Sequence, residues 1–120
     1  VTIGSNNLIA DAKAQAINLA NNGYTKPTLE KIQVLGKQGL GMFMVGAHSM
    51  HAAGYITDHE KLMSEKLAYT ICGGDLSVPT LVSEQYLLDL ERQSFLSLCG
   101  ERKTLERIEY MLKTGKPLRN

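Results

Sequence analysis

Three histidines are the side chains in this sequence best suited to metal binding, and His48 and His51 lie three residues apart. That spacing places both on one face of a helix, and Asp58 and Glu60, on either side of His59, could add oxygen ligands. A closed zinc site needs four ligands, however, and no Cys or carboxylate stands at a ligand interval within the helix that carries the first two histidines. We therefore interpret all three as polar surface residues, His59 being a first-turn residue, and predict no metal site.

Cysteines and carboxylates are the residues of this sequence that could carry covalent or acid–base catalysis. Cys72 and Cys99 each precede a glycine near a helix end, on the apolar side of the pattern. A helix C-terminus does not lower the pKa of a thiol, so both are predicted to be small buried hydrophobic residues. Glu84, Asp89 and Glu91 are too widely spaced for a tight acid–base pair and are interpreted as a cap and a solvated face. No catalytic residue is predicted.

Glycines around position 40 raise the question of a phosphate-binding loop. Gly39-Leu-Gly41 is followed by Gly46, but Met44 stands where a dinucleotide fingerprint needs its third glycine. A strong buried strand should also precede such a loop. We interpret these glycines as sites of close helix packing and flexible helix entry, and predict no cofactor site in this chain.

Basic residues gather near the end of the sequence, where the last 20 residues carry six Lys or Arg against three Glu. Lys113, Lys116 and Arg119 close this stretch with no acidic residue among them. A mixed charged surface is the ordinary explanation. The alternative is that these three residues contact the phosphates of a ligand or an acidic partner.

The elements that would position these residues are mainly helical. Apolar residues recur at spacings of three and four in most of the chain, and glycines mark the helix ends. Thr57 to Glu60 has the form of a capping box, and Ser83 is a good N-cap. Glu109 can pair with Lys113 on a helix surface. We predict an all-α fold of about five helices in bundle-like packing, with at most one short extended segment near residues 31–35. The predicted helices cover residues 5–22, 39–54, 57–73 and 83–100, and a fifth carries Leu105, Ile108, Met111 and Leu112 on one face and ends at Gly115.

Bulk properties narrow the class of protein. A length of 120 residues suits a single module, with the first helix and a connector in residues 1–38 and a helical core in 39–120. The net charge of +1 gives no argument for nucleic-acid binding. Two cysteines favour a reducing cytoplasm over a secreted disulfide framework, and no apolar run is long enough for a membrane span. The start at Val1, without Met, leads us to expect a piece of a longer chain.

Specific sequence runs resemble one enzyme family. The run SEQYLLDLERQSFLSLCGERKT at residues 83–104, the closing GKPLRN at 115–120 and the upstream GYITDHE at 54–60 are similar to the C-terminal end of bacterial multifunctional 3-hydroxyacyl-CoA dehydrogenases of fatty-acid β-oxidation. The resemblance covers about residues 39–120. It implies a parent that oxidises L-3-hydroxyacyl-CoA with NAD and carries an enoyl-CoA hydratase/isomerase part.

The resemblance carries no catalytic residue to this chain, because the family's glycine loop, His-Glu pair and oxyanion loops have no matching motifs here. The tail from Phe95 also resembles the C-terminal helices of crotonase-fold enzymes, which pack at subunit contacts close to bound CoA. Lys113 and Lys116 are the matching basic positions, and we add Arg119 as a third candidate contact to CoA phosphates.

These observations predict a C-terminal structural or subunit-contact module, without catalysis of its own, in an NAD-dependent 3-hydroxyacyl-CoA dehydrogenase. Its expected partners are the upstream catalytic domains of the same chain, acyl-CoA for the parent enzyme, and further copies in a homo-oligomer. The rival hypothesis is a free-standing helical protein-interaction module. A third, a small CoA-binding protein, rests on the three basic residues alone.

Overall fold

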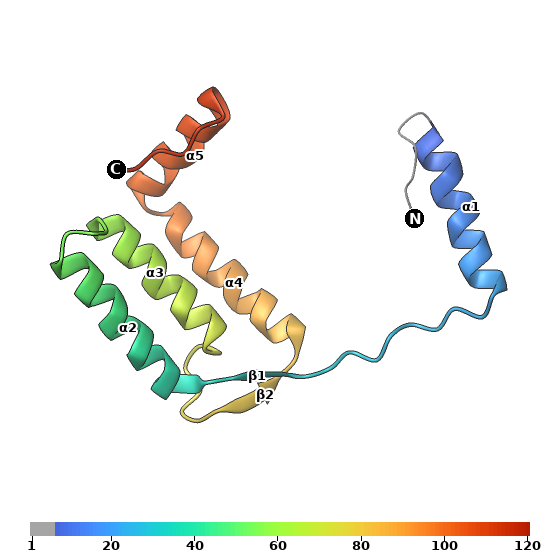
Figure 1. Cartoon of the computed structure of the whole chain (residues 1–120), viewed down its shortest axis with the longest axis horizontal. Helices are drawn as coiled ribbons and strands as arrows, with labels where there is room; N and C mark the ends of the chain where they lie inside the picture. Colours follow the sequence, from blue (N-terminus) through green and yellow to red (C-terminus); the bar gives the residue numbers. More distant parts are fainter. Residues whose placement is uncertain (1–6) are drawn as a thin grey trace.

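The computed structural model describes residues 7–120 and is mainly helical there, which confirms the predicted fold class. The predicted start of the first helix at Ser5 lies outside the described residues. Figure 1 labels the elements. In chain order they are α1 (Leu8–Asn21), β1 (Ile32–Val34), α2 (Gly36–Ala52), α3 (Asp58–Ile71), β2 (Thr80–Val82), α4 (Glu84–Cys99) and α5 (Arg102–Thr114).

Helix ends follow the local signals in the sequence. At the start of α3, Thr57 Oγ1 accepts a hydrogen bond from the Glu60 amide at 3.2 Å, and the Thr57 amide donates to Glu60 Oε2 at 2.8 Å. This is the predicted capping box. Ser83 caps α4 by accepting from the Tyr86 amide, and Gly115 ends α5 in the left-handed conformation at φ +68°. These ends were predictable because each is decided within one turn.

The two short strands form an antiparallel pair in the register Ile32↔Val82, Gln33↔Leu81 and Val34↔Thr80. The predicted extended segment near residues 31–35 is β1, but its partner β2 was missed. A three-residue strand beside Pro79 has no periodicity of its own and exists because β1 supplies its hydrogen bonds. The pairing buries Val34 and Val82.

Helix α2 begins at Gly36, three residues earlier than predicted. Gly36 has φ +65°, and a Cβ atom there would lie 2.7 Å from the main-chain oxygen of Leu76. The amides of Gly36 and Lys37 donate to the carbonyls of Cys72 and Leu76, both at 2.8 Å. The acceptors lie far along the chain, so no local pattern could have shown this start.

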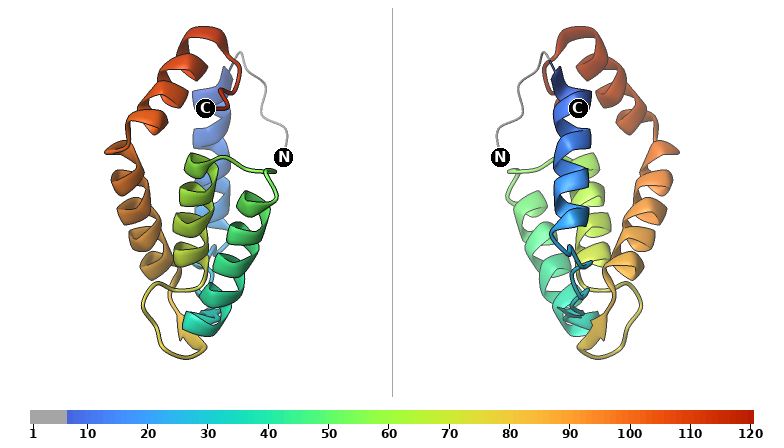
Figure 2. Two further views of the ribbon diagram at one scale, coloured as in Figure 1. Left: turned by 90° about the vertical axis from the view of Figure 1, so that its left-hand side faces the viewer. Right: turned by 90° about the vertical axis from the view of Figure 1, so that its right-hand side faces the viewer.

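Helices α2, α3 and α4 lie side by side as one helical layer, with α5 next to α4 (Figures 1 and 2). The buried residues are few and mostly small. At the α3–α4 contact, the hydroxyls of Thr70 and Ser94 lie 3.0 Å apart and are hydrogen-bonded. The buried apolar residues are Val34, Ala47, Ala68, Cys72 and Val82.

Helix α1 stands away from this layer, at the end of an extended connector (Figure 1). No residue of α1 is buried. The radius of gyration is 20.2 Å, whereas a compact chain of this length has about 14 Å. Helix α1 therefore lies outside the packed helices, and we call it, together with its connector, the α1 arm (residues 8–31). Nothing in residues 8–22 could have revealed this, because an amphipathic pattern predicts burial without naming the partner.

Candidate interaction site

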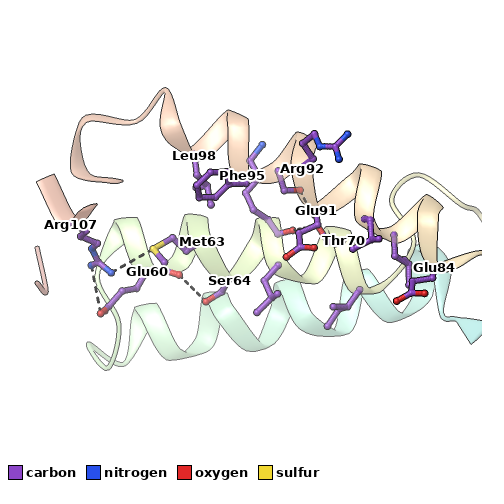
Figure 3. Close-up of a pocket in the computed structure, with 16 residues that line it drawn as sticks. Glu60, Met63, Ser64, Thr70, Glu84, Glu91, Arg92, Phe95, Leu98 and Arg107 are labelled. Atoms are coloured by element: carbon purple, nitrogen blue, oxygen red, sulfur yellow. Dashed lines mark hydrogen bonds and ion pairs between the residues drawn. The ribbon is translucent and has the colours of Figure 1, made fainter. Parts of the chain in front are cut away.

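A groove with an apolar floor runs between α3 and α4 and encloses about 1020 Å³ (Figure 3). Its floor is built from residues one turn apart on each helix, because positions i, i+4 and i+7 share a helix face. The hydrogen bond between Thr70 and Ser94 ties the two helices together at the groove. The apolar lining consists of Met63, Leu67, Ile71, Leu87, Leu88, Phe95 and Leu98.

Most of this lining is open to solvent. The exposed fraction is 63% for Leu67, 56% for Phe95 and 48% for Ile71. Monomeric proteins seldom expose a contiguous apolar patch of this kind unless it binds something. The sequence predicted the two helices that form this groove but not the groove itself.

Charges of both signs surround the groove. Glu60, Glu84 and Glu91 carry the negative charge, and Lys66, Arg92 and Arg107 the positive charge. Two of the carboxylates weighed above, Glu84 and Glu91, thus line the same groove, two helical turns apart. The rim is balanced and gives no electrostatic preference for a strongly charged ligand.

One end of the groove is closed by contacts between α5, the end of the chain and the start of α3. Arg107 donates to Asn120 Oδ1 at 2.7 Å and forms an ion pair with Glu60 at 3.8 Å. Arg119 forms a second ion pair with Glu60 at 3.2 Å and donates to the Tyr55 carbonyl. The pKa of Glu60 lies below its usual value, first because the Thr57 amide donates to it, and then because Arg119 and Arg107 stand nearby. These polar contacts fix the position of α5.

The apolar face predicted for α5 is present but does not pack on the rest of the chain. No residue of α5 is buried, and Leu112 is 81% exposed. The helix is attached through polar groups, among them Thr104 and Arg107. Its open face, formed by Leu105, Ile108, Met111 and Leu112, is a second unpartnered surface.

The three basic residues proposed as phosphate contacts differ in their surroundings. Lys113 pairs with Glu109, as predicted from their spacing, and lowers the pKa of that carboxyl group. Arg119 is directed to Glu60 and Tyr55. Lys116 is exposed, and within residues 7–120 its ammonium group has no recorded hydrogen bond or ion pair. A phosphate would therefore compete with carboxylates for Lys113 and Arg119.

The histidines have three different environments. His48 is exposed, and His51 Nε2 lies 2.7 Å from Asp58 Oδ1. His59 is only 4% exposed and shares a hydrogen bond of 3.0 Å with Thr104 Oγ1 of α5. The interpretation of His59 as a surface residue is thus wrong. Burial is the main cause that lowers its pKa, followed by Arg107 and Lys103. In the part of the chain that the structure describes, no three metal-binding side chains come together.

The remaining candidates are structural. Cys72 is 1% exposed and burial raises the pKa of its thiol, which confirms a buried hydrophobic role; Cys99 is half-buried. Gly39 is buried against the Leu35 side chain, whereas a Cβ atom at Gly41 or Gly46 would meet nothing within 4 Å. Close packing therefore explains only the first of these three glycines.

The residues at the start of α2 do not fit a dinucleotide. Gly39 and Gly41 lie inside the helix, and the amides of Gly36 and Lys37 at its N-terminus already bind carbonyls of the chain. An NAD pyrophosphate needs such amides free.

No helix in the described part of the chain has the length and apolar character of a membrane-spanning segment.

Comparison with known proteins gives an informative relative. The chain is 42% identical over all 120 residues to a probable 3-hydroxyacyl-CoA dehydrogenase of Bacillus subtilis (strain 168). The match spans 15% of the length of that relative. No family model matches the sequence, and no solved structure matches it either. The chain is thus similar throughout to a small region of a much longer probable dehydrogenase, in agreement with the dehydrogenase part of the resemblance stated above.

Proposed function

We propose that this chain is a structural and subunit-contact module, C-terminal in position, of an NAD-dependent L-3-hydroxyacyl-CoA dehydrogenase of fatty-acid β-oxidation in the cytoplasm. Upstream domains of the same polypeptide carry the chemistry and hold NAD, and an enoyl-CoA hydratase/isomerase part belongs to the same parent. The observation that carries the proposal is the 42% identity along the whole chain to a region that makes up 15% of a dehydrogenase.

The chemistry of the described residues supports a role without catalysis. The thiol of Cys72 is inaccessible, His59 is held by Thr104, and an apolar groove lies open between α3 and α4. A nucleophile needs an adjacent base, and a general base needs access to substrate. Packing against other domains uses what this chain offers, which is exposed apolar surface.

The test compares residues 1–120 with the longer gene product that contains them. Both are assayed for NADH formation, by absorbance, from NAD and an L-3-hydroxyacyl-CoA. We expect turnover by the longer protein and none by residues 1–120. Turnover by the 120-residue chain, or inactivity of a folded longer protein on a series of acyl-chain lengths, would contradict the proposal.

The same parent gives a role to the basic residues. Lys113, Lys116 and Arg119 are proposed to contact the phosphates of the acyl-CoA, with Lys116 the most available of the three. Titration of CoA into the 15N-labelled chain should shift the amide signals of residues 113–119, and the K116E variant should shift less. Unchanged signals up to millimolar CoA would remove this contact from the proposal.

A free-standing interaction module is the second candidate, because the exposed groove would serve it equally well. The gene sequence upstream of Val1 distinguishes the two candidates. An open reading frame that continues upstream of Val1 and contains a glycine-loop βαβ pattern supports the dehydrogenase module, and a start codon at Val1 supports the free-standing module.

A further inference from the structure

The chain exposes far more surface than a compact protein of its size. The solvent-accessible area is 9172 Å², whereas a monomer of this mass exposes about 6400 Å². Permanent interfaces bury roughly 2,000–5,000 Å² summed over both partners, so an excess of about 2800 Å² on one chain is enough for its side of such an interface. Exposed large apolar side chains lie on the α1 arm and on each of the helices α2 to α5. The molecule therefore carries surface suited to a permanent partner.

The α3/α4 groove has dimensions that suit a helix. Helix α3 has 14 residues and α4 has 16, so the groove is about 20 Å long. An apolar floor flanked by two helices accepts the stripe of a third helix, with large side chains at positions i, i+3 or i+4, and i+7. A flat surface of the same composition would not favour a helix over other structures.

The groove rim restricts the character of the occupant. Three carboxylates and three cationic groups surround the floor, and Arg107 and Arg92 already have acidic partners, Glu60 and Asp89. A strongly anionic ligand would find no unopposed cluster of positive charge. An occupant with an apolar stripe and mixed charges at its flanks fits best.

Helix α1 is a poor candidate for this position. It is separated from the helical layer in Figure 1. Ala12 and Ala16 lie at the centre of its apolar stripe, one turn apart. Such small side chains would leave the middle of a groove of about 1020 Å³ unfilled. The occupant needs large apolar side chains at its centre.

We propose that the α3/α4 groove holds an amphipathic helix from another part of the same longer polypeptide. The inference rests on the proposed function in one respect, which is that a longer polypeptide exists. The matching relative has most of its length outside the matched region, so a chain of that kind has ample sequence to supply such a helix. Supply from the same polypeptide also makes the contact intramolecular, which raises the effective concentration of the helix at the groove.

Thiol labelling tests this directly. L67C and F95C are introduced separately into a C99S background, in both residues 1–120 and the longer protein, and the rate of maleimide labelling is measured. Cys72 is buried and stays unreactive in the folded chain. We expect both introduced thiols to react about tenfold or more slowly in the longer protein, because a covered thiol reacts only when the contact opens. R102C is the matched control, since the Arg102 side chain is 92% exposed and lies outside the groove.

Three outcomes would overturn the inference. One is equal labelling of L67C in the two proteins while R102C also labels equally. Another is protection in residues 1–120 that increases with protein concentration, which would make a second copy the occupant. The last is protection in residues 1–120 that the substitution I17D in α1 releases, which would make α1 the occupant.

A second measurement guards against a folding defect in the cysteine variants. F95D in the longer protein should lower the midpoint of thermal unfolding more than L96D does, because Leu96 is exposed on the same helix but does not line the groove. NADH formation by the longer protein is recorded separately. Activity without groove protection refutes this inference alone, and protection without activity refutes the proposed dehydrogenase function alone.

Discussion

The sequences of both the α1 arm and the helical layer of α2–α4 predict helices, but only the layer is held together by buried side chains. Helix α1 has 14 residues and buries none of them, whereas the layer is anchored by Val34, Cys72 and Ala68, each at most 3% exposed. An isolated helix of this length is marginally stable in water, because the hydrogen bonds of a few turns do not offset the free-energy cost of forming the first turn. The comparison teaches that a helical pattern is not evidence of a shared core.

The largest difference between the two regions should follow from placing a charge in each. V34D buries a carboxylate at a position that is 2% exposed and packed against Gly73. We expect a loss of roughly 4 kcal/mol or more, enough to abolish cooperative urea unfolding of the layer. I9D, on a residue of α1 that is 81% exposed, should leave the urea midpoint unchanged by circular dichroism. Equal effects would show that α1 shares the core.

The second-largest difference in stability between the two regions is expected when a glycine is replaced in each. Gly36 has φ +65° and Gly23 has φ +72°, but only Gly36 has backbone atoms within 3 Å of an added Cβ. G36A should therefore cost about 2 to 3 kcal/mol in the unfolding of the layer, from strain plus the clash. G23A should not change that transition. A G36A variant as stable as the parent would mean that Leu76 and Val78 move away easily.

A helix cap in each region gives a smaller effect. T57A removes the capping box of α3 together with the hydrogen bond from Thr57 Oγ1 to the Asn120 carbonyl at 3.1 Å. We expect a loss of about 1 kcal/mol, seen as a fall of about 4 to 8 °C in the thermal midpoint. N7A is the control, because Asn7 precedes α1 without a side-chain cap hydrogen bond. T57S should restore most of the loss.

The smallest expected effect is a dependence on pH that only the layer shows. Burial holds the pKa of His59 below its value of 6.5 in the unfolded chain, so the unfolded state binds the proton more tightly. Stability is thus complete above about pH 6.5 and declines as the pH falls from there toward the folded pKa. Urea unfolding at pH 7.5 and 5.5 should show this decline, and H59Q should reduce it. H48Q should leave the decline intact, because His48 is exposed.

The interaction site was only partly predictable from the sequence. The two helices that form the groove were predicted, and so was the pair between Glu109 and Lys113. The sequence could not predict that Leu67 and Phe95 are exposed. The pattern of apolar residues on a helix is the same whether the surface that covers them belongs to this chain or to another part.

What the sequence determined by itself is local. The capping box at Thr57, the cap at Ser83 and the left-handed end at Gly115 each depend on atoms within about one helical turn. The tertiary structure alone decided the pairing of β1 with β2, the burial of His59 beneath α5, and the separation of α1 from the layer. These depend on contacts between residues far apart in the chain, whose free energy no local pattern of apolar residues contains.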